Sequence, residues 1–332
     1  MAITLKEVAE RAGVSRSAVS RTFTPGASVS RKMRERVERA AADLGYHPNA
    51  LASSLTTGRT KMIGLVSNNF HNPFFLEVFD LFTRGLQDRG LRPLLVNLTD
   101  VTDPQSSVRM LRAYSVDGVI VASSTLPQGF SRAFRDAGLP VVHSFGRYSQ
   151  NPHVDIIGID NIECGRMAAR ALLEREYKSV AFMGGPERAT STQDRLKGFY
   201  DALSGYSDVA VSHSFAEDYT FDAGRAEMQR LLRADPADAY FCGDDVLSIG
   251  ALSAIADAGL SVPRDIGIVG LNDMEMARWE NINLTTLHQP IAEIIEASIE
   301  KITNTLKGSD QEPEALLFPC HIVERGTLRK MP

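Results

Sequence analysis

The 332-residue chain is poor in cysteine and has no long apolar run. Its three cysteines, Cys164, Cys242 and Cys320, lie far apart and are odd in number, which excludes a disulfide framework and a Cys-x-x-Cys zinc site. No stretch approaches the roughly 18 apolar residues of a membrane span, and Lys6 and Glu7 stand where a signal peptide would have its apolar core. We therefore expect buried thiols in a cytoplasmic protein that neither spans a membrane nor is exported.

The sequence also lacks the common signatures of enzymes. It contains no phosphate-binding GxxxxGK[ST] loop, no HExxH zinc motif and no GxSxG nucleophile elbow, and the Gly184-Gly185 pair lacks the third glycine of GxGxxG. The adjacent Asp244 and Asp245 are conceivable as an acid/base pair, but neighbours at the start of a helix diverge by about 100°, and helix capping explains them better. We expect no catalysis, no cofactor and no metal ion.

What is present is an ordinary globular composition, 43% hydrophobic and 23% charged, at a length that suits two domains. The formal net charge of -5 is unevenly spread. Residues 1–60 carry ten basic and five acidic side chains, a net charge of +5, whereas the other 272 residues carry 26 basic and 36 acidic ones, a net charge of −10. A basic head on an acidic body is typical of a polyanion-binding module fused to a separate domain.

The first residues of the head predict a helix-turn-helix. Thr4 and Glu7 match the S/T-x-x-E capping box that begins a helix, and Gly13 stands where that helix is expected to end. Ser15 is the next N-cap and begins a second short helix after a tight turn. A third helix is expected over about 31–44.

In a helix-turn-helix, the second helix enters the major groove of DNA with its N-terminal residues on the base edges. Arg16, Ser17 and Arg21 occupy that part of the expected second helix. Arg16 is the leading candidate for reading bases, because an arginine can donate two hydrogen bonds to guanine, whereas a serine reaches bases or phosphates. A three-helix packing module whose arginines are only solvated is the alternative interpretation of this segment.

The segment GVSRSAVSR, followed by a helix that ends in LGYHPNALASSL, resembles the N-terminal segment of the LacI/GalR (lactose-repressor/galactose-repressor) family of bacterial transcription regulators. The resemblance implies a hinge helix over 48–55 that orders on operator DNA, with Leu55 as the wedge in the minor groove. The DNA contacts that it implies are Thr4, Ser15, Arg16, Ser17, Ser20, Arg21, Asn49, Ala52 and Leu55. Ser53 departs from the arginine that many members carry, and 50–60 can also be interpreted as a polar linker.

From residue 61 on, short apolar runs alternate with amphipathic stretches, which predicts parallel strands joined by crossover helices. The expected strands are 62–66, 94–98, 118–122, 141–143, 156–159, 180–183, 239–242 and 267–270. The expected helices are 74–89, 105–114, 163–174, 193–203, 221–233, 245–258 and 291–306. The pattern predicts a doubly wound α/β architecture with enough chain for two sheets.

Open α/β sheets bind ligands beyond the carboxyl ends of their strands. Amides, hydroxyls and carboxylates dominate the residues that follow the expected strands, among them Asn68, Asn69, Asn72, Ser123, Ser124, Phe145, Arg147, Ser191, Arg195, Asp244 and Asn272. Such groups, with an aromatic ring such as that of Tyr219, suit a polyhydroxylated solute. Taken singly, an Asp or Asn after a strand is more often a helix cap.

The resemblance to the LacI/GalR family continues through the body and so covers the whole chain. It implies a two-lobed, periplasmic-binding-protein-like effector domain. The effector contacts that it implies are Asn68, Asn72, Phe145, Ser191, Arg195, Tyr219, Asp244, Asn272 and Gln289. Asn272 and Phe145 are departures that remove two potential carboxylates and leave the identity of the ligand open.

The domain division implied by the resemblance has three parts. They are 1–47 for the helix-turn-helix domain, 48–60 for the hinge helix and linker, and 61–332 for effector binding and dimerisation. Within the last part, lobe 1 is expected over about 61–158 and 290–318, and lobe 2 over about 159–289 and 319–332.

The function expected from the sequence is that of a sequence-specific transcriptional regulator, a repressor that acts as a homodimer on double-stranded, pseudo-palindromic operator DNA. A small effector, such as a sugar, a polyol or a related metabolite, would bind between the lobes and control operator binding. The alternative is a solute-binding protein of a sugar transport system without DNA function, which would need export. The basic head argues against that alternative.

Overall fold

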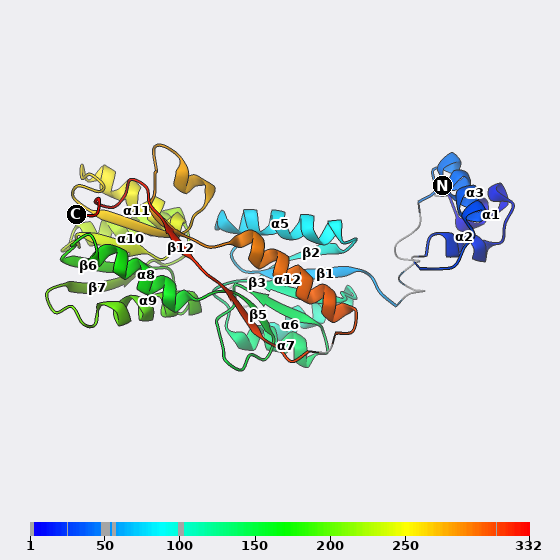
Figure 1. Cartoon of the computed structure of the whole chain (residues 1–332), viewed down its shortest axis with the longest axis horizontal. Helices are drawn as coiled ribbons and strands as arrows, with labels where there is room; N and C mark the ends of the chain where they lie inside the picture. Colours follow the sequence, from blue (N-terminus) through cyan, green and yellow to red (C-terminus); the bar gives the residue numbers. More distant parts are fainter. Residues whose placement is uncertain (1–2, 25, 48–53, 55–57, 99–102, 310) are drawn as a thin grey trace. The chain divides into compact units, whose positions relative to one another are not determined.

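The computed structural model describes residues 3–24, 26–47, 54, 58–98, 103–309 and 311–332 (Figure 1). The chain divides into two compact units, Met1–Lys61 and Met62–Pro332, which are called the head and the body below. No helix in the described part of the chain is long and apolar enough to cross a membrane.

The described part of the head consists of three short helices. They are α1 (Leu5–Ala12), α2 (Arg16–Thr22) and α3 (Arg31–Leu44). Thr4 begins α1 with the predicted capping box, in which the Glu7 carboxylate accepts a hydrogen bond from Thr4 N at 2.7 Å and Thr4 Oγ1 accepts one from Glu7 N. Gly13 and Gly45 end α1 and α3 with φ of +60° and +64°, which glycine adopts without strain.

One valine from each helix forms the centre of the head. Val8, Val19 and Val37 are completely buried. The rings of Phe23 and Tyr46, 5.8 Å apart, close this small core from the ends of α2 and α3. The apolar residues of all three helices are thus used inside the head, which leaves their polar faces exposed.

The first lobe of the body contains a six-stranded parallel sheet. In spatial order its strands are β11 (Ala315–Phe318), β5 (Asp155–Ile159), β4 (Val141–Ser144), β3 (Gly118–Ala122), β1 (Met62–Ser67) and β2 (Arg92–Asn97). Its described helices are α5 (Phe74–Asp88), α6 (Pro104–Ala113), α7 (Gln128–Asp136) and α12 (Ile291–Leu306). The pair α5 and α12 covers one face of the sheet and the pair α6 and α7 the other, so the central strands are apolar on both faces.

The second lobe repeats this architecture. In spatial order its strands are β12 (His321–Val323), β10 (Thr286–His288), β9 (Gly267–Asn272), β8 (Ala239–Cys242), β6 (Ser179–Gly184) and β7 (Ala210–Phe215). Its helices are α8 (Asn161–Leu173), α9 (Thr190–Leu203), α10 (Phe221–Leu232), α11 (Asp245–Asp257) and the 3-10 helix η1 (Glu275–Arg278). Only β12 runs antiparallel to its neighbour among these described strands.

The chain passes between the two lobes after β5, after β10 and after β11 (Figure 1). Each crossing leaves one sheet at the carboxyl end of a strand. The residues that follow the strands of both lobes therefore lie at the lobe junction, where a ligand site is expected in this class of sheet.

The structure contains elements that the sequence did not predict, namely β7, β10, β11, β12 and α7. The last three of these strands have only three or four residues, and β7 is an edge strand whose exposed face is polar. Helix α9 begins at Thr190, three residues earlier than expected. Its start was not predicted because the N-cap residue, Ala189, has no side chain that could accept a capping hydrogen bond.

Candidate functional site

Helix α2 buries one face in the head and presents the other to solvent. Ala18, Val19 and Thr22 are buried. The exposed positions are Ser15, Arg16, Ser17, Ser20 and Arg21. Ser15 begins the helix, as predicted, by accepting a hydrogen bond from Ala18 N at 3.2 Å. Five of the nine residues predicted from the sequence to contact DNA therefore share the free face of α2 and its N-cap.

Most other arginines of the head are already engaged. Arg11 pairs with an acidic side chain of α3, and Arg34 and Arg36 donate to the carbonyl oxygens of Thr22 and Gly13 at 2.7 and 2.9 Å. Within the described residues, Arg16 and Arg21 form no ion pair with an acidic side chain, and Arg21 donates only through its Nε, to Ser17 O of its own helix at 3.4 Å. Two cations on one exposed helix face thus remain available for phosphates or base edges.

Three of the predicted DNA contacts, Asn49, Ala52 and Leu55, lie outside the described residues, as does Ser53. Thr4 lies at the start of α1, where its side chain is exposed and bonded to Glu7 at 2.8 Å.

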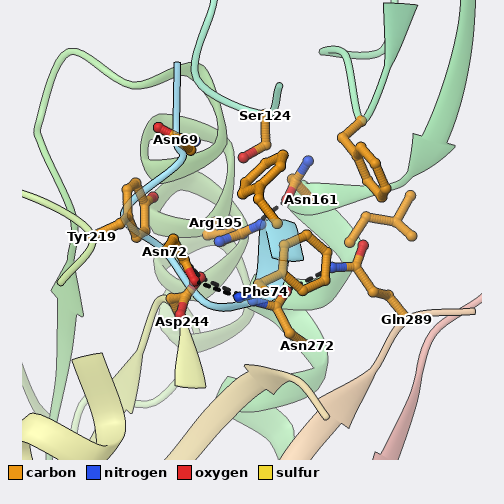
Figure 2. A pocket seen from close by; sticks show the side chains of 13 residues that line it. Asn69, Asn72, Phe74, Ser124, Asn161, Arg195, Tyr219, Asp244, Asn272 and Gln289 are labelled. Carbon is orange, nitrogen blue, oxygen red and sulfur yellow. Dashed lines mark hydrogen bonds between the residues drawn. The ribbon is translucent and has the colours of Figure 1, made fainter. Parts of the chain in front are cut away.

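A polar pocket lies at the lobe junction of the body (Figure 2). Its lining residues are Asn69, Asn72, Phe74, Phe75, Ser124, Phe145, Ile159, Asn161, Arg195, Tyr219, Asp244, Asn272 and Gln289. Seven of the nine residues predicted from the sequence to contact an effector are among them. These side chains pack so closely that the free space inside the pocket is about 20 Å³, room for about one water molecule.

Asp244 is the centre of a hydrogen-bond network that spans the two lobes (Figure 2). Its Oδ2 accepts from Asn72 Nδ2 of the first lobe at 3.0 Å and from Asn272 Nδ2 of the second at 2.9 Å. Gln289 Nε2 in turn donates to Asn272 Oδ1 at 2.6 Å. The other carboxylate oxygen caps α11 by accepting from Val246 N at 2.7 Å. Asp244 is thus both a helix cap and a pocket residue.

Burial determines the protonation chemistry of this network. It raises the pKa of Asp244 to about 6, although the hydrogen bonds that the carboxylate accepts act in the opposite direction. The neighbouring Asp245 has its pKa raised to about 7 by burial, but it is turned away from the pocket and accepts from Thr286 Oγ1 at 2.5 Å and Met274 N at 2.8 Å. Asp245 therefore holds the loop after β9 in place.

Arg195 is the cation of the pocket and is almost completely buried. Its Nε donates to Asn161 Oδ1 at 2.8 Å, and its guanidinium also donates to the carbonyl oxygen of Gly243. The position of Arg195 depends on the close contact between α8 and α9. A Cβ on Gly198 would lie 1.8 Å from Ile162 O, so only glycine allows the two helix backbones to approach this closely.

Aromatic rings form the apolar part of the pocket. Phe145 follows β4 and packs edge-on against Phe74 and Phe75, with ring centroids 5.8 and 6.3 Å apart. Its φ of +63° is rare for a bulky residue and is held by a hydrogen bond from Phe145 N to Ile157 O at 2.7 Å. Tyr219 lies on the opposite side, where its hydroxyl bonds to Thr192 at 2.6 Å.

Two predicted effector residues do not line the pocket. Asn68 is bonded to Ser123 Oγ at 2.8 Å and Thr125 Oγ1 at 2.9 Å, which directs its side chain toward the end of β3. Ser191 is buried in α9 and lies 3.4 Å from the Tyr219 hydroxyl. The sequence predicted that Ser191 lies in the loop before α9, whereas the helix already begins at Thr190.

Sequence reasoning missed four lining residues, one of which is Ile159, the last residue of β5. Asn161 lies two residues after the end of β5 and was a detectable signal, but the helix that it begins was expected to start two residues later. Phe74 and Phe75, at the start of α5, cannot be distinguished in the sequence from the other apolar residues of that helix.

Curated relatives match the chain along almost its full length. The transcriptional regulator CelR of Thermobifida fusca is 32% identical over 334 residues, which cover 97% of each chain. The transcriptional repressor PurR of Escherichia coli O139:H28 (strain E24377A / ETEC) is 29% identical over 334 residues, covering 99% of this chain and 98% of that protein.

Solved structures show the same arrangement with bound ligands. The Lac repressor dimer bound to operator and the anti-inducer ONPF matches with a TM-score of 0.88 at 25% identity, covering 99% of this chain and all (100%) of that one. The complex of the transcriptional regulator CelR with cellobiose matches with a TM-score of 0.71 at 30% identity, covering 98% and 99%.

A helix-turn-helix head joined to a two-lobed body with a polar pocket at the lobe junction defines a DNA-binding regulator that responds to a small molecule. Residues 4–49 match the model of bacterial regulatory proteins, lacI family, and residues 169–328 match a periplasmic binding protein-like domain. The chain belongs to the LacI family of transcriptional regulators. The predicted resemblance and fold class are confirmed, and the alternative of a transport protein is set aside.

Proposed function

We propose that this regulator is a homodimeric repressor whose hold on operator DNA is controlled by a neutral, polyhydroxylated effector in the pocket at the lobe junction. The observation that carries this proposal is the polar network in which Asn72 of one lobe meets Asp244 of the other at 3.0 Å. A ligand that takes the place of this hydrogen bond changes the contact between the lobes, and so binds one arrangement of the lobes more tightly than another. This difference in affinity is the condition for a ligand-driven population shift.

The chemistry of the pocket favours hydroxyl groups. Amides both donate and accept hydrogen bonds, and Asn72, Asn272 and Gln289 place three of them around the Asp244 carboxylate. Arg195 adds donors, and the aromatic residues supply apolar surface for the face of a sugar ring. The CelR–cellobiose complex, a structure of similar fold, supports a sugar as the effector class.

On the DNA side, the proposal assigns base reading to Arg16, Ser17 and Arg21 of α2. The hinge assignment for 48–60, including Asn49, Ala52 and the Leu55 wedge, rests on the sequence resemblance alone. Two half-sites of a pseudo-palindrome need two heads, and the operator-bound dimer of the Lac repressor supports a homodimer here. The site of action is then the cytoplasm, where bacterial operator DNA lies.

The body has no assigned catalytic role in this proposal. Asp244 already accepts hydrogen bonds from three donors, and Asp245 is bonded away from the pocket. Asp244 has no hydroxyl or thiol among these donors, and the Thr286 hydroxyl that donates to Asp245 is buried and does not line the pocket. The relatives, which are regulators rather than enzymes, support the same assignment.

The experiment measures DNA binding and ligand response of the full chain separately. Fluorescence anisotropy with DNA from upstream of its own gene is expected to show sequence-specific binding that Arg16→Ala weakens about 10- to 100-fold. Arg39→Ala is the control, since Arg39 is an exposed arginine on α3 instead of α2.

Arg195→Ala is expected to keep operator affinity and lose the ligand response. The ligand comes from a thermal-shift screen of sugars, polyols and sugar acids, because a ligand of the folded state raises its stability. Absence of any sequence preference in DNA binding would refute the regulatory function, and a full response by the Arg195 variant would refute the location of the effector site.

A further inference from the structure

A wide groove continues outward from the pocket between the two lobes. It has a volume of about 1200 Å³ and shares Asn69 and Tyr219 with the pocket, so the two spaces adjoin at these side chains. The free space of the pocket itself is only about 20 Å³, whereas ligand sites in proteins measure roughly 300–1,000 Å³. A ligand held at Asp244 therefore has most of its available room in the groove.

The two walls of the groove differ in chemistry. The first lobe contributes Leu126, Pro127 and Phe130 after β3, beside three polar residues, Asn68, Asn69 and Thr125. The second lobe contributes four carboxyl groups, those of Glu187, Glu217, Asp218 and Asp222, against one cation, Arg188. Apolar surface, which also includes Phe215 of the second lobe, together with a cluster of hydrogen-bond acceptors matches the apolar faces and the hydroxyl edges of a pyranose ring.

Two of the four carboxylates have a structural role as well. Asp218 accepts a hydrogen bond from Tyr219 N at 2.7 Å, and Asp222 lies in the first turn of α10, where a negative charge stabilises the helix. Glu187 and Glu217 are exposed and lie in loops after β6 and β7. Their charges are therefore the ones that can be removed without changing a helix end.

We propose that the groove is an outer subsite, so that the effector is a neutral oligosaccharide of two or more sugar units. This inference rests on the proposed function. One terminal unit takes the place of the Asn72–Asp244 hydrogen bond, and the following units lie in the groove, where the carboxylates accept hydrogen bonds from their hydroxyls. The same carboxylates repel phosphorylated sugars and sugar acids.

A neutral ligand fits both ends of this path better than a charged one. An anion meets the four carboxyl groups of the groove, whereas the inner end holds one group of each sign, the Arg195 guanidinium and the Asp244 carboxylate, and so favours no net charge. A single glucose unit bonded to Asp244 would leave most of the groove empty. The length and the charge of the ligand are therefore the two properties that the structure selects.

The test is isothermal titration of the full chain with glucose, cellobiose, cellotetraose, maltose, maltotetraose, cellobionate and glucose 6-phosphate. In one linkage series, the disaccharide or tetrasaccharide is expected to bind at least about tenfold more tightly than glucose, because additional ring surface is buried. Cellobionate, in which the reducing glucose unit is an open-chain gluconate with a carboxylate, is expected to bind about three- to tenfold more weakly than cellobiose at low salt.

The double variant Glu187→Gln/Glu217→Gln isolates the charge effect. It is expected to reduce the gap in affinity between cellobiose and cellobionate. Salt at 1 M is expected to do the same, because it shortens the electrostatic screening length to about 3 Å. Glu280→Gln, at an exposed acid of the same lobe outside the groove, is expected to leave the gap unchanged. Thermal unfolding of each variant checks that the body is folded.

Each outcome has a defined meaning. Glucose binding as tightly as both longer series, or an anionic sugar binding more tightly than its neutral counterpart, overturns the outer subsite while the repressor function stands. Binding of none of these sugars, with a different effector found by screening, also overturns it. Loss of sequence-specific DNA binding in the parallel anisotropy measurement would instead refute the proposed function itself.

Discussion

Replacing Asp244 by asparagine is expected to change how the stability of the body depends on pH. The Asp244 side chain is buried, and burial raises its pKa from 3.8 to about 6 in the folded protein. The unfolded chain therefore releases this proton at lower pH than the folded one. The stabilisation associated with the raised pKa is fully present below about pH 4 and is lost as the pH rises through about 6.

The magnitude follows from the size of the shift. One unit of pKa corresponds to about 1.4 kcal/mol, so a shift of roughly two units makes the wild-type body lose up to about 3 kcal/mol between pH 4 and pH 7. Against a typical total stability of about 5–15 kcal/mol, this loss is large. Asp244→Asn has no carboxyl group to titrate at this position and is expected to lack this part of the pH dependence.

The assay is urea unfolding at a series of pH values, followed by tryptophan fluorescence and linear extrapolation of the free energy of unfolding. Trp279 is the chain's one tryptophan and lies in the second lobe, so the signal reports on the body. Asp257→Asn, at an exposed position at the other end of α11, is the matched control and should keep the wild-type slope. Parallel pH curves for wild type and Asp244→Asn would refute the reasoning.

Three further outcomes are expected. Gly198→Ala places a Cβ 1.8 Å from Ile162 O and should lower stability by about 1–3 kcal/mol or more in thermal unfolding, whereas Gly205→Ala, which meets nothing within 4 Å, should change little. Effector affinity, measured by titration calorimetry, should fall about tenfold from pH 7.5 to pH 5, because a ligand hydroxyl donates best to ionised Asp244; a flat profile would contradict this. Leu55→Ala should weaken operator binding at least about tenfold without changing effector affinity, and unchanged operator binding would remove the wedge assignment.

Local signals predicted the helices well. The capping box of Thr4 and Glu7 and the N-cap at Ser15 join residues three positions apart, so their hydrogen bonds can be inferred from spacing. Helix α12 has the predicted bounds because its buried stripe of isoleucines repeats with the period of a helix. The strand β7 was missed for the opposite reason, since an edge strand with four polar or exposed positions has no apolar run to detect.

By itself, the sequence determined that a basic helix-turn-helix precedes an acidic α/β body and that polar residues follow its strands, because charge and periodicity are properties of neighbouring residues. Only the tertiary structure decided which of those residues meet. Asn72 and Asp244, 172 positions apart, are joined across the lobes, whereas Asn68 is held away by Ser123. The direction of a side chain at a strand end depends on packing and hydrogen bonds from other strands, and these partners are distant in the sequence.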